Sequence, residues 1–188
     1  MCSLGSLYDR LSERAVIMYC KDMTSRKNGD ETIPNVFNVG WLSRSKSFKT
    51  GKADIEFLKK LKSIFYGNSH YSSEVNLLRA TSRPCEICGV TVKEHKYKSG
   101  YKGLGNSEIW IAHKGKYYAA PSLIIHYIES HDYLPPKKYV KAVLSTELDI
   151  PFNAADEELS MLKLIAKRKK VVGKASFFRR VLFFFKKN

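Results

Sequence analysis

Acidic residues are scarce in this sequence relative to basic ones. Its 188 residues include 33 lysines and arginines against 18 aspartates and glutamates, which gives a net charge of +15 at pH 7. From Lys163 onward there are ten basic residues and no acidic one. The rest of the chain is therefore only mildly basic. Attraction to phosphates or to anionic lipids is predicted to concentrate at the C-terminus.

Long hydrophobic runs are also lacking. No stretch approaches the roughly 18–20 apolar residues that a bilayer-spanning helix needs. The N-terminus lacks the basic, then apolar, then small-residue pattern of a secretory signal. These two absences favour a cytoplasmic protein.

Cysteine is scarce too, and only two of the four cysteines lie close together. Cys85 and Cys88 form a Cys-x-x-Cys pair, whereas Cys2 and Cys20 are far from it in the sequence. Without a secretory signal, this arrangement favours a metal-binding turn over a disulfide framework. Cys2 and Cys20 are expected to be unpaired thiols.

The hydrophobic spacing predicts an α+β chain. Polar residues between 25 and 34 indicate a turn or a mobile loop, and Pro121 is expected at the first position of a helix. Helices are predicted over 6–24, 53–65, 122–130, 136–144 and 156–170, a strand over 36–42, and a hairpin over 108–112 and 116–119. We expect three parts: an N-terminal helix and loop (1–35), a core domain (36–145), and a C-terminal helix with a basic, Phe-rich tail (146–188).

Four residues have the chemistry and spacing of a zinc site. A Cys-x-x-Cys turn presents Cys85 and Cys88 to one side, and His126 and His131 have the three-to-five-residue separation found in Cys2His2 sites. The order of turn, hairpin and helix predicts a small zinc-stabilised ββα module, similar to a treble clef, packed with flanking helices. The 37 residues between Cys88 and His126 are too many for a DNA-reading zinc finger. His95 and His113 are alternative ligands, and a thiol pair beside two unrelated histidines is the alternative without a metal.

Catalytic alternatives can be weighed against this structural site. A zinc deaminase requires a His-x-Glu motif upstream of its cysteines, and His70 has no glutamate two residues later. A metal-dependent nuclease remains an alternative, with His113, Asn106 and Glu108 as its residues, although no His-Asn-His order is present. A catalytic cysteine is disfavoured because a thiolate bound to zinc is a poor nucleophile. We favour a protein that is not an enzyme.

Several short motifs occur together in this chain. They are Val39-Gly40-Trp41-Leu42, Ile55-Glu56-Phe57-Leu58, Cys85-x-x-Cys88, Leu104-Gly105-Asn106-Ser107-Glu108-Ile109, Tyr118-Ala119-Ala120-Pro121, His126-Tyr127-Ile128, His131-x-Tyr133-x-Pro135-Pro136 and Tyr139 to Val143. Over residues 36–144 this set resembles a family of small bacterial proteins that share a domain of unknown function. The resemblance implies a compact, cytoplasmic, bacterial protein. It implies nothing for residues 1–35 or for the basic tail.

The predicted function is binding of nucleic acid through a basic, aromatic surface. Cations and aromatic rings alternate between the cysteine pair and the hairpin, which permits phosphate neutralisation together with base stacking. The residues are Lys93, Lys96, Tyr97, Lys98, Tyr101 and Lys102. The alternative is an interaction or immunity-type protein with an acidic protein partner. The tail from Phe177 to Lys187 adds a possible contact with an anionic membrane surface, and its packing on the core is the other interpretation. Zn²⁺ is the only cofactor expected.

Overall fold

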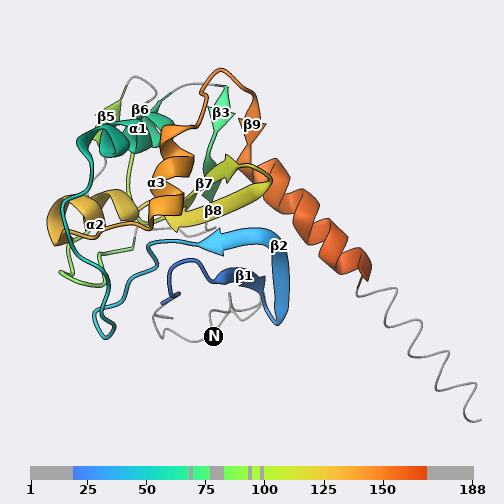
Figure 1. Cartoon of the computed structure of the whole chain (residues 1–188), viewed down its shortest axis with the longest axis horizontal. Coiled ribbons are helices and arrows are strands. Elements are labelled where there is room, and N and C mark those ends of the chain that lie inside the picture. Colours follow the sequence, from blue (N-terminus) through green and yellow to red (C-terminus); the bar gives the residue numbers. More distant parts are fainter. Residues whose placement is uncertain (1–18, 68–69, 77–82, 93–94, 98–99, 169–188) are drawn as a thin grey trace, which may run out of the picture.

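The computed structural model describes residues 19–67, 70–76, 83–92, 95–97 and 100–168. Its centre is a five-stranded mixed sheet with the order β1-β2-β8-β7-β4 (Figure 1). Strands β2 and β8 run parallel, whereas the other neighbouring strands of this sheet are antiparallel. The bounds are β1 (Ser25–Asn28), β2 (Glu31–Asn38), β4 (Glu74–Asn76), β7 (Ser107–His113) and β8 (Lys116–Pro121).

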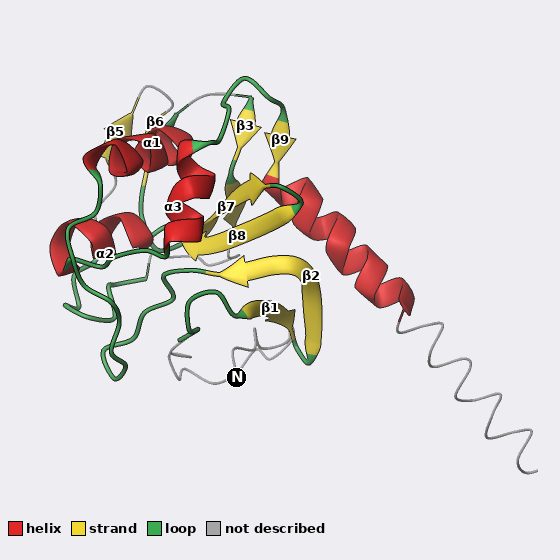
Figure 2. Cartoon of the chain, viewed as in Figure 1, coloured by secondary structure: helices red, strands yellow, loops and turns green. Residues whose placement is uncertain are grey.

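Helices and two small sheets complete the described chain (Figure 2), so the predicted α+β class is confirmed. The labelled helices are α1 (Ile55–Tyr66), α2 (Ile124–His131) and α3 (Lys137–Leu144), and residues 154–168 are also helical. Strand β3 (Tyr71–Ser72) pairs in parallel with β9 (Phe152–Asn153), and β5 (His95–Tyr97) pairs antiparallel with β6 (Gly100–Lys102). None of the helices in the described residues is long and apolar enough to cross a bilayer.

The middle of the central sheet, at strands β7 and β8, is buried on both faces. Successive side chains of a strand point to opposite faces, so Ile109 and Ile111 of β7 join one apolar cluster and Trp110 joins another. The larger cluster contains residues of α1, α2 and α3. The smaller one contains Trp110, Ala119, Ala154 and Ile165, so helix 154–168 covers the second face. A strand buried on both faces has no polar side to mark it in the sequence.

Helix α1 confirms the prediction for residues 53–65. Its N-cap is Asp54, whose carboxylate accepts hydrogen bonds from the N–H groups of Glu56 and Phe57 at 2.7 and 2.9 Å. This is the side-chain cap that a helix start requires, because the first N–H groups have no partner within the helix. The apolar side chains that recur at helical spacing in α1, including Phe57, Leu61 and Ile64, are buried.

The N-terminal predictions need correction. Residues 19–24 of the predicted helix over 6–24 are not helical, and residues 1–18 lie outside the described part. The predicted loop over 25–34 is instead the β1–β2 hairpin, which turns at Gly29 with a φ of 60°. Cys20, expected to be an unpaired thiol, is buried and disulfide-bonded. The hairpin was missed because its strands carry polar and charged residues, which hydrophobic spacing does not register.

A buried ion pair explains why such a polar strand belongs to the sheet. Arg26 of β1 is 2% exposed and pairs with Glu108 of β7, which is fully buried. Arg26 Nη1 also donates to Asn38 Oδ1 at 3.1 Å, and its guanidinium lies 5.2 Å from the Trp41 ring. Glu108 Oε2 accepts from Trp110 Nε1 at 2.9 Å. The buried charges are therefore paired and hydrogen-bonded, as burial of charge requires.

The second half of the chain follows the prediction more closely. The hairpin is β7–β8, and Lys114 and Gly115 at its turn both have positive φ, which matches a two-residue type I′ turn. Pro121 ends β8 instead of opening a helix, and α2 begins at Ile124. Helix α3 begins after Pro136 as predicted. Helix 154–168 is capped by Asn153, which accepts from the N–H groups of Ala155 and Asp156.

Candidate metal centre

The Cys85–Cys88 segment forms a tight turn that is closed by backbone hydrogen bonds. The Cys85 N–H donates to the Val90 carbonyl, and the Gly89 N–H donates to the Cys85 carbonyl, both at 2.8 Å. Gly89 has a φ of 76°, a conformation that glycine adopts at no steric cost. The N–H groups of Ile87 and Cys88 point at Cys85 Sγ, at 3.4 and 3.5 Å. This turn is built to stabilise negative charge on sulfur.

Helix α2 supplies two histidines at opposite ends. His126 is its third residue and His131 is its last. The helix stops there because Asp132 adopts a left-handed conformation with a φ of 50°, and its N–H returns to the Tyr127 carbonyl. The two imidazole rings lie 5.0 Å apart and are nearly perpendicular. The helix predicted over 122–130 therefore runs from Ile124 to His131.

The turn and the helix bring the four predicted ligands together. Cys85 Sγ lies 3.3 Å from His131 Nε2, and Cys88 Sγ lies 3.4 Å from His126 Nε2. All four ligand atoms lie within 4.8 Å of one another. With Zn–S bonds of about 2.3 Å and Zn–N bonds of about 2.0 Å, the S···N edge of a tetrahedron is about 3.5 Å. The residues present therefore fit a four-coordinate metal ion.

Burial shapes the protonation of these ligands. It raises the pKa of the Cys85 thiol, and the backbone N–H groups of Cys88 and Ile87 oppose that rise. It lowers the pKa of His126, and the nearby His131 lowers it further, while Glu129 opposes the change. A lowered pKa favours the neutral imidazole of His126, which is the form that binds a metal, whereas the buried thiol of Cys85 needs a nearby cation to be held as a thiolate. Ser130 Oγ lies 3.2 Å from His126 Nδ1 and orients this ring.

The candidate centre is tied to the core from several directions. Cys85 is 1% exposed and belongs to the larger apolar cluster, together with Tyr127 and Ile128 of α2. The Arg83 N–H donates to the Gly105 carbonyl at 3.2 Å, and the Gly105 N–H donates to Ser122 Oγ at 2.8 Å. The turn, the segment before β7 and the start of α2 are thus held together without any metal contact.

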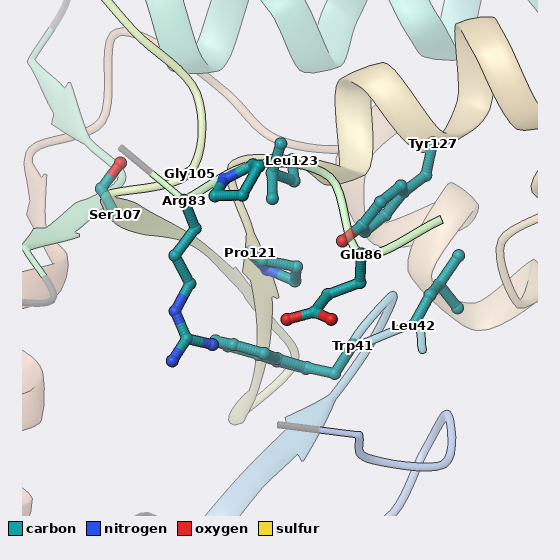
Figure 3. Close-up of a pocket in the computed structure, with 10 residues that line it drawn as sticks. Trp41, Leu42, Arg83, Glu86, Gly105, Ser107, Pro121, Leu123 and Tyr127 are labelled. Carbon is teal, nitrogen blue, oxygen red and sulfur yellow. The ribbon is translucent and has the colours of Figure 1, made fainter. Parts of the chain in front are cut away.

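A small cavity lies beside this turn (Figure 3). Its lining includes Trp41, Arg83, Glu86 and Tyr127, and the Arg83 and Glu86 side chains extend toward the Trp41 indole. The cavity volume is about 30 Å³, enough for one or two water molecules. Ligand pockets usually measure about 300–1,000 Å³, so this cavity is too small for a substrate.

The residues of the nuclease alternative are not brought together. Glu108 is engaged with Arg26 inside the sheet, and His113 Nδ1 lies 3.0 Å from Ser145 Oγ at the far end of β7. In the β7–β8 register Glu108 is paired with Pro121 and His113 with Lys116. Within the described ranges, neither belongs to a cluster of three or more metal-binding side chains.

Four of the six predicted nucleic-acid residues lie on a separate hairpin, β5–β6. Strand β5 contains Lys96 and Tyr97, strand β6 contains Tyr101 and Lys102, and Lys96 is paired with Tyr101. Lys93 and Lys98 lie outside the described residues, as does the predicted membrane-contacting segment from 177 to 187. This surface stays a prediction, as do the boundaries of the three predicted parts.

The fold and the site define an α+β domain with a Cys2His2 cluster that can hold a metal ion. The chain belongs to a family described as a domain of unknown function, DUF7919, whose model matches residues 18–144. That match supports the resemblance to a domain family and extends it toward the N-terminus, because the resemblance began at residue 36. It includes all four candidate ligands. No curated protein and no solved structure matches the chain.

Proposed function

We propose that the protein is a binding protein built around a structural Zn²⁺ ion, held by Cys85, Cys88, His126 and His131. The observation that carries this proposal is the convergence of two sulfur and two nitrogen atoms within 4.8 Å. Two thiolates and two imidazoles are a donor set that Zn²⁺ takes in structural sites. The order of cysteine turn, β7–β8 hairpin and α2 supports a treble-clef-like module.

Four protein ligands leave no coordination position for water, which a catalytic zinc ion requires. The metal then acts as a cross-link between the Cys85–Cys88 turn and α2. In this role its ligands hold the turn against the helix, and no proton or electron is moved.

Absence of catalysis is a testable consequence of a closed site. We expect zinc-loaded protein to nick neither supercoiled plasmid nor single-stranded RNA when Mg²⁺ or Mn²⁺ is added. A gel assay at equal protein and plasmid concentrations measures this. Cleavage that disappears in His113→Ala, with an unchanged melting temperature, would contradict the proposal and restore the nuclease alternative.

We further propose that the basic surface contacts nucleic acid. The net charge of +15 and the lysines and tyrosines of the β5–β6 hairpin support this partner, since phosphate contacts account for most nonspecific affinity. The alternative partner, an acidic protein, would contact the same positive charge of this chain, but it has no bases that could stack on the tyrosine rings. Salt dependence and ring substitutions separate the two.

The affinity for duplex DNA should fall steeply with salt. Because each phosphate contact contributes about 0.9 to the slope of log affinity against log salt, Lys96→Gln with Lys102→Gln should flatten the slope by up to about 2. Fluorescence anisotropy of a labelled duplex measures the slope. Lys114→Gln, in the exposed β7–β8 turn, is the matched control. An unchanged slope in the double variant would remove the hairpin from the interface.

A further inference from the structure

A groove of about 650 Å³ lies between loop 49–54 and helix α3, on residues that the proposed function does not use. Its apolar lining consists of Ala53, Leu134, Pro135, Pro136, Val140 and Leu144. Leu144 is 47% exposed, and Ile55, next in the chain to the lining residue Asp54, is 67% exposed. The groove is as large as common ligand pockets, and it offers apolar surface that the described chain leaves open.

The walls of the groove carry positive charge on both sides. Lys49 and Lys52 belong to the loop wall, and Lys137 and Lys141 belong to α3. All four side chains are exposed. Asp54 is the one acidic residue of the lining, and its carboxylate already caps α1. Helix α3 has no side-chain cap at its start, so its first turn adds partial positive charge beside Lys137.

The floor of the groove is held in place by backbone hydrogen bonds. The Gly51 N–H donates to the Asp132 carbonyl, and the Leu134 N–H donates to the Lys49 carbonyl, both at 2.9 Å. Thr50 and Tyr133 form an isolated bridge between these bonds. A preformed floor lowers the ordering cost of binding. The floor segment that contains Asp132 and Leu134 begins directly after His131, so a metal ion bound at the candidate centre would fix one end of this segment.

We propose that this groove binds an acidic, amphipathic segment of a partner protein. Bulky apolar side chains of the segment would cover the floor formed by Leu134, Val140 and Leu144. Carboxylates on both of its edges would face the lysines of the two walls, because opposite charges at a rim favour the correct partner and speed its association. An amphipathic helix in a hydrophobic groove is a common mode of peptide recognition.

Other occupants fit these observations less well. The groove is concave, whereas a bilayer surface is planar, and its lining contains no aromatic ring on which a nucleic-acid base can stack. A lipid with a single carboxylate cannot pair with the lysines on both walls of the groove at once. Residues 163–188 of this chain contain ten basic residues and no acidic one, so like charges disfavour self-docking of that end.

The experiment uses the full, zinc-loaded chain and a labelled peptide of about 16 residues with leucine and phenylalanine at helical spacing and glutamate elsewhere. Fluorescence anisotropy should give micromolar affinity. A scrambled peptide of the same composition, and one with lysine in place of glutamate, should each bind at least about tenfold more weakly. Equal binding of the scrambled peptide, or no binding of the acidic one, overturns the proposal.

Leu144→Asp should weaken binding of the acidic peptide by at least about tenfold, because it places a carboxylate on the apolar floor. Leu159→Asp is the matched control, since Leu159 lies on helix 154–168 outside the groove and is 50% exposed, similar to the 47% of Leu144. Both leucines are exposed, so the two variants should melt at similar temperatures. Equal peptide affinity in the two variants would locate binding elsewhere.

Reversing charges on both walls tests the role of the lysines independently of the apolar floor. The double variant Lys49→Glu with Lys137→Glu should bind the acidic peptide more weakly and the lysine peptide more tightly. The control, Lys114→Glu with Lys116→Glu, should bind both peptides as the unmodified protein does. Lys96→Gln with Lys102→Gln should leave peptide binding intact, which distinguishes this groove from the proposed nucleic-acid surface. Displacement of the peptide by duplex DNA, or by vesicles of phosphatidylglycerol at equal charge, would contradict a protein partner.

Discussion

Replacing Cys85 with serine is expected to remove the metal and to lower the melting temperature by about 8–16 °C. A ligand present at 1,000 times its dissociation constant stabilises a protein by about 4 kcal/mol, and 1 kcal/mol corresponds to about 2–4 °C in a chain of this size. Cys85 is almost fully buried, so its replacement also places a hydroxyl in the apolar cluster. The combined effect is expected to make the variant poorly soluble.

Two measurements on the same samples test this result. Elemental analysis should find about one zinc per chain in the unmodified protein and none in Cys85→Ser or His126→Ala, since structural sites bind zinc with about 10–16 kcal/mol. A chelator should lower the melting temperature of the unmodified protein toward that of the variants. His113→Ala, a histidine outside the cluster, should keep both its zinc and its stability. Stoichiometric zinc in both ligand variants would refute the assignment.

Arg26→Met should destabilise the fold by about 3–5 kcal/mol, because it leaves the Glu108 carboxylate buried without its partner. A second carboxyl group worsens the loss. Burial raises the pKa of Glu158, the charge of Glu108 raises it further, and Arg26 opposes both effects. Without the Arg26 guanidinium, no positive charge remains to offset the repulsion between the carboxyl groups of Glu108 and Glu158.

The matched control is the double variant Arg26→Met with Glu108→Leu, which removes both charges together. Replacing a buried pair by apolar residues of similar volume is often neutral or stabilising, so the double variant should unfold at a higher urea concentration than Arg26→Met alone. Urea unfolding followed by tryptophan fluorescence measures both. A single variant as stable as the unmodified protein would mean that the ion pair contributes nothing to the fold.

Local patterns in the sequence identified the four residues that the structure brings together as a candidate metal centre. Cys85 and Cys88 lie close together in the sequence, and so do His126 and His131. A single turn brings the first pair together, and the end of a single helix brings the second pair together. The helix predicted over 53–65 and the hairpin predicted over 108–112 and 116–119 also depend on local patterns, and both are confirmed as α1 and β7–β8. Zinc sites use few ligand types, so the sequence analysis could assign the cysteine pair and the histidine pair to one site although 37 residues lie between Cys88 and His126.

Features that depend on contacts between distant residues were missed. Strand β1 joins the sheet through the pairing of Arg26 with Glu108, which are 82 positions apart. In the sequence, each of these charged residues by itself suggests a solvent-exposed surface. The groove is formed by loop 49–54 and the segment from Leu134 to Ser145, and neither carries a motif of its own. Pro121 was placed in a helix because proline suits a first helical turn, but here it forms the end of β8.

The parallel pairing of β2 with β8 sets the order of events during synthesis of the chain. Asn38 pairs with Ala119, so strand β2 can pair with β1 early, but its parallel partner β8 exists only after 81 further residues have been made. At about 5–20 residues per second, that interval lasts about 4–16 s. His131 follows the end of β8 by ten residues, so the last candidate metal ligand is made almost as soon as β2 can pair with β8. If the cluster binds the proposed zinc ion, metal loading and closure of the sheet belong to the same late step of synthesis. The part of the chain that is made earlier must then avoid aggregation without the metal and without the closed sheet.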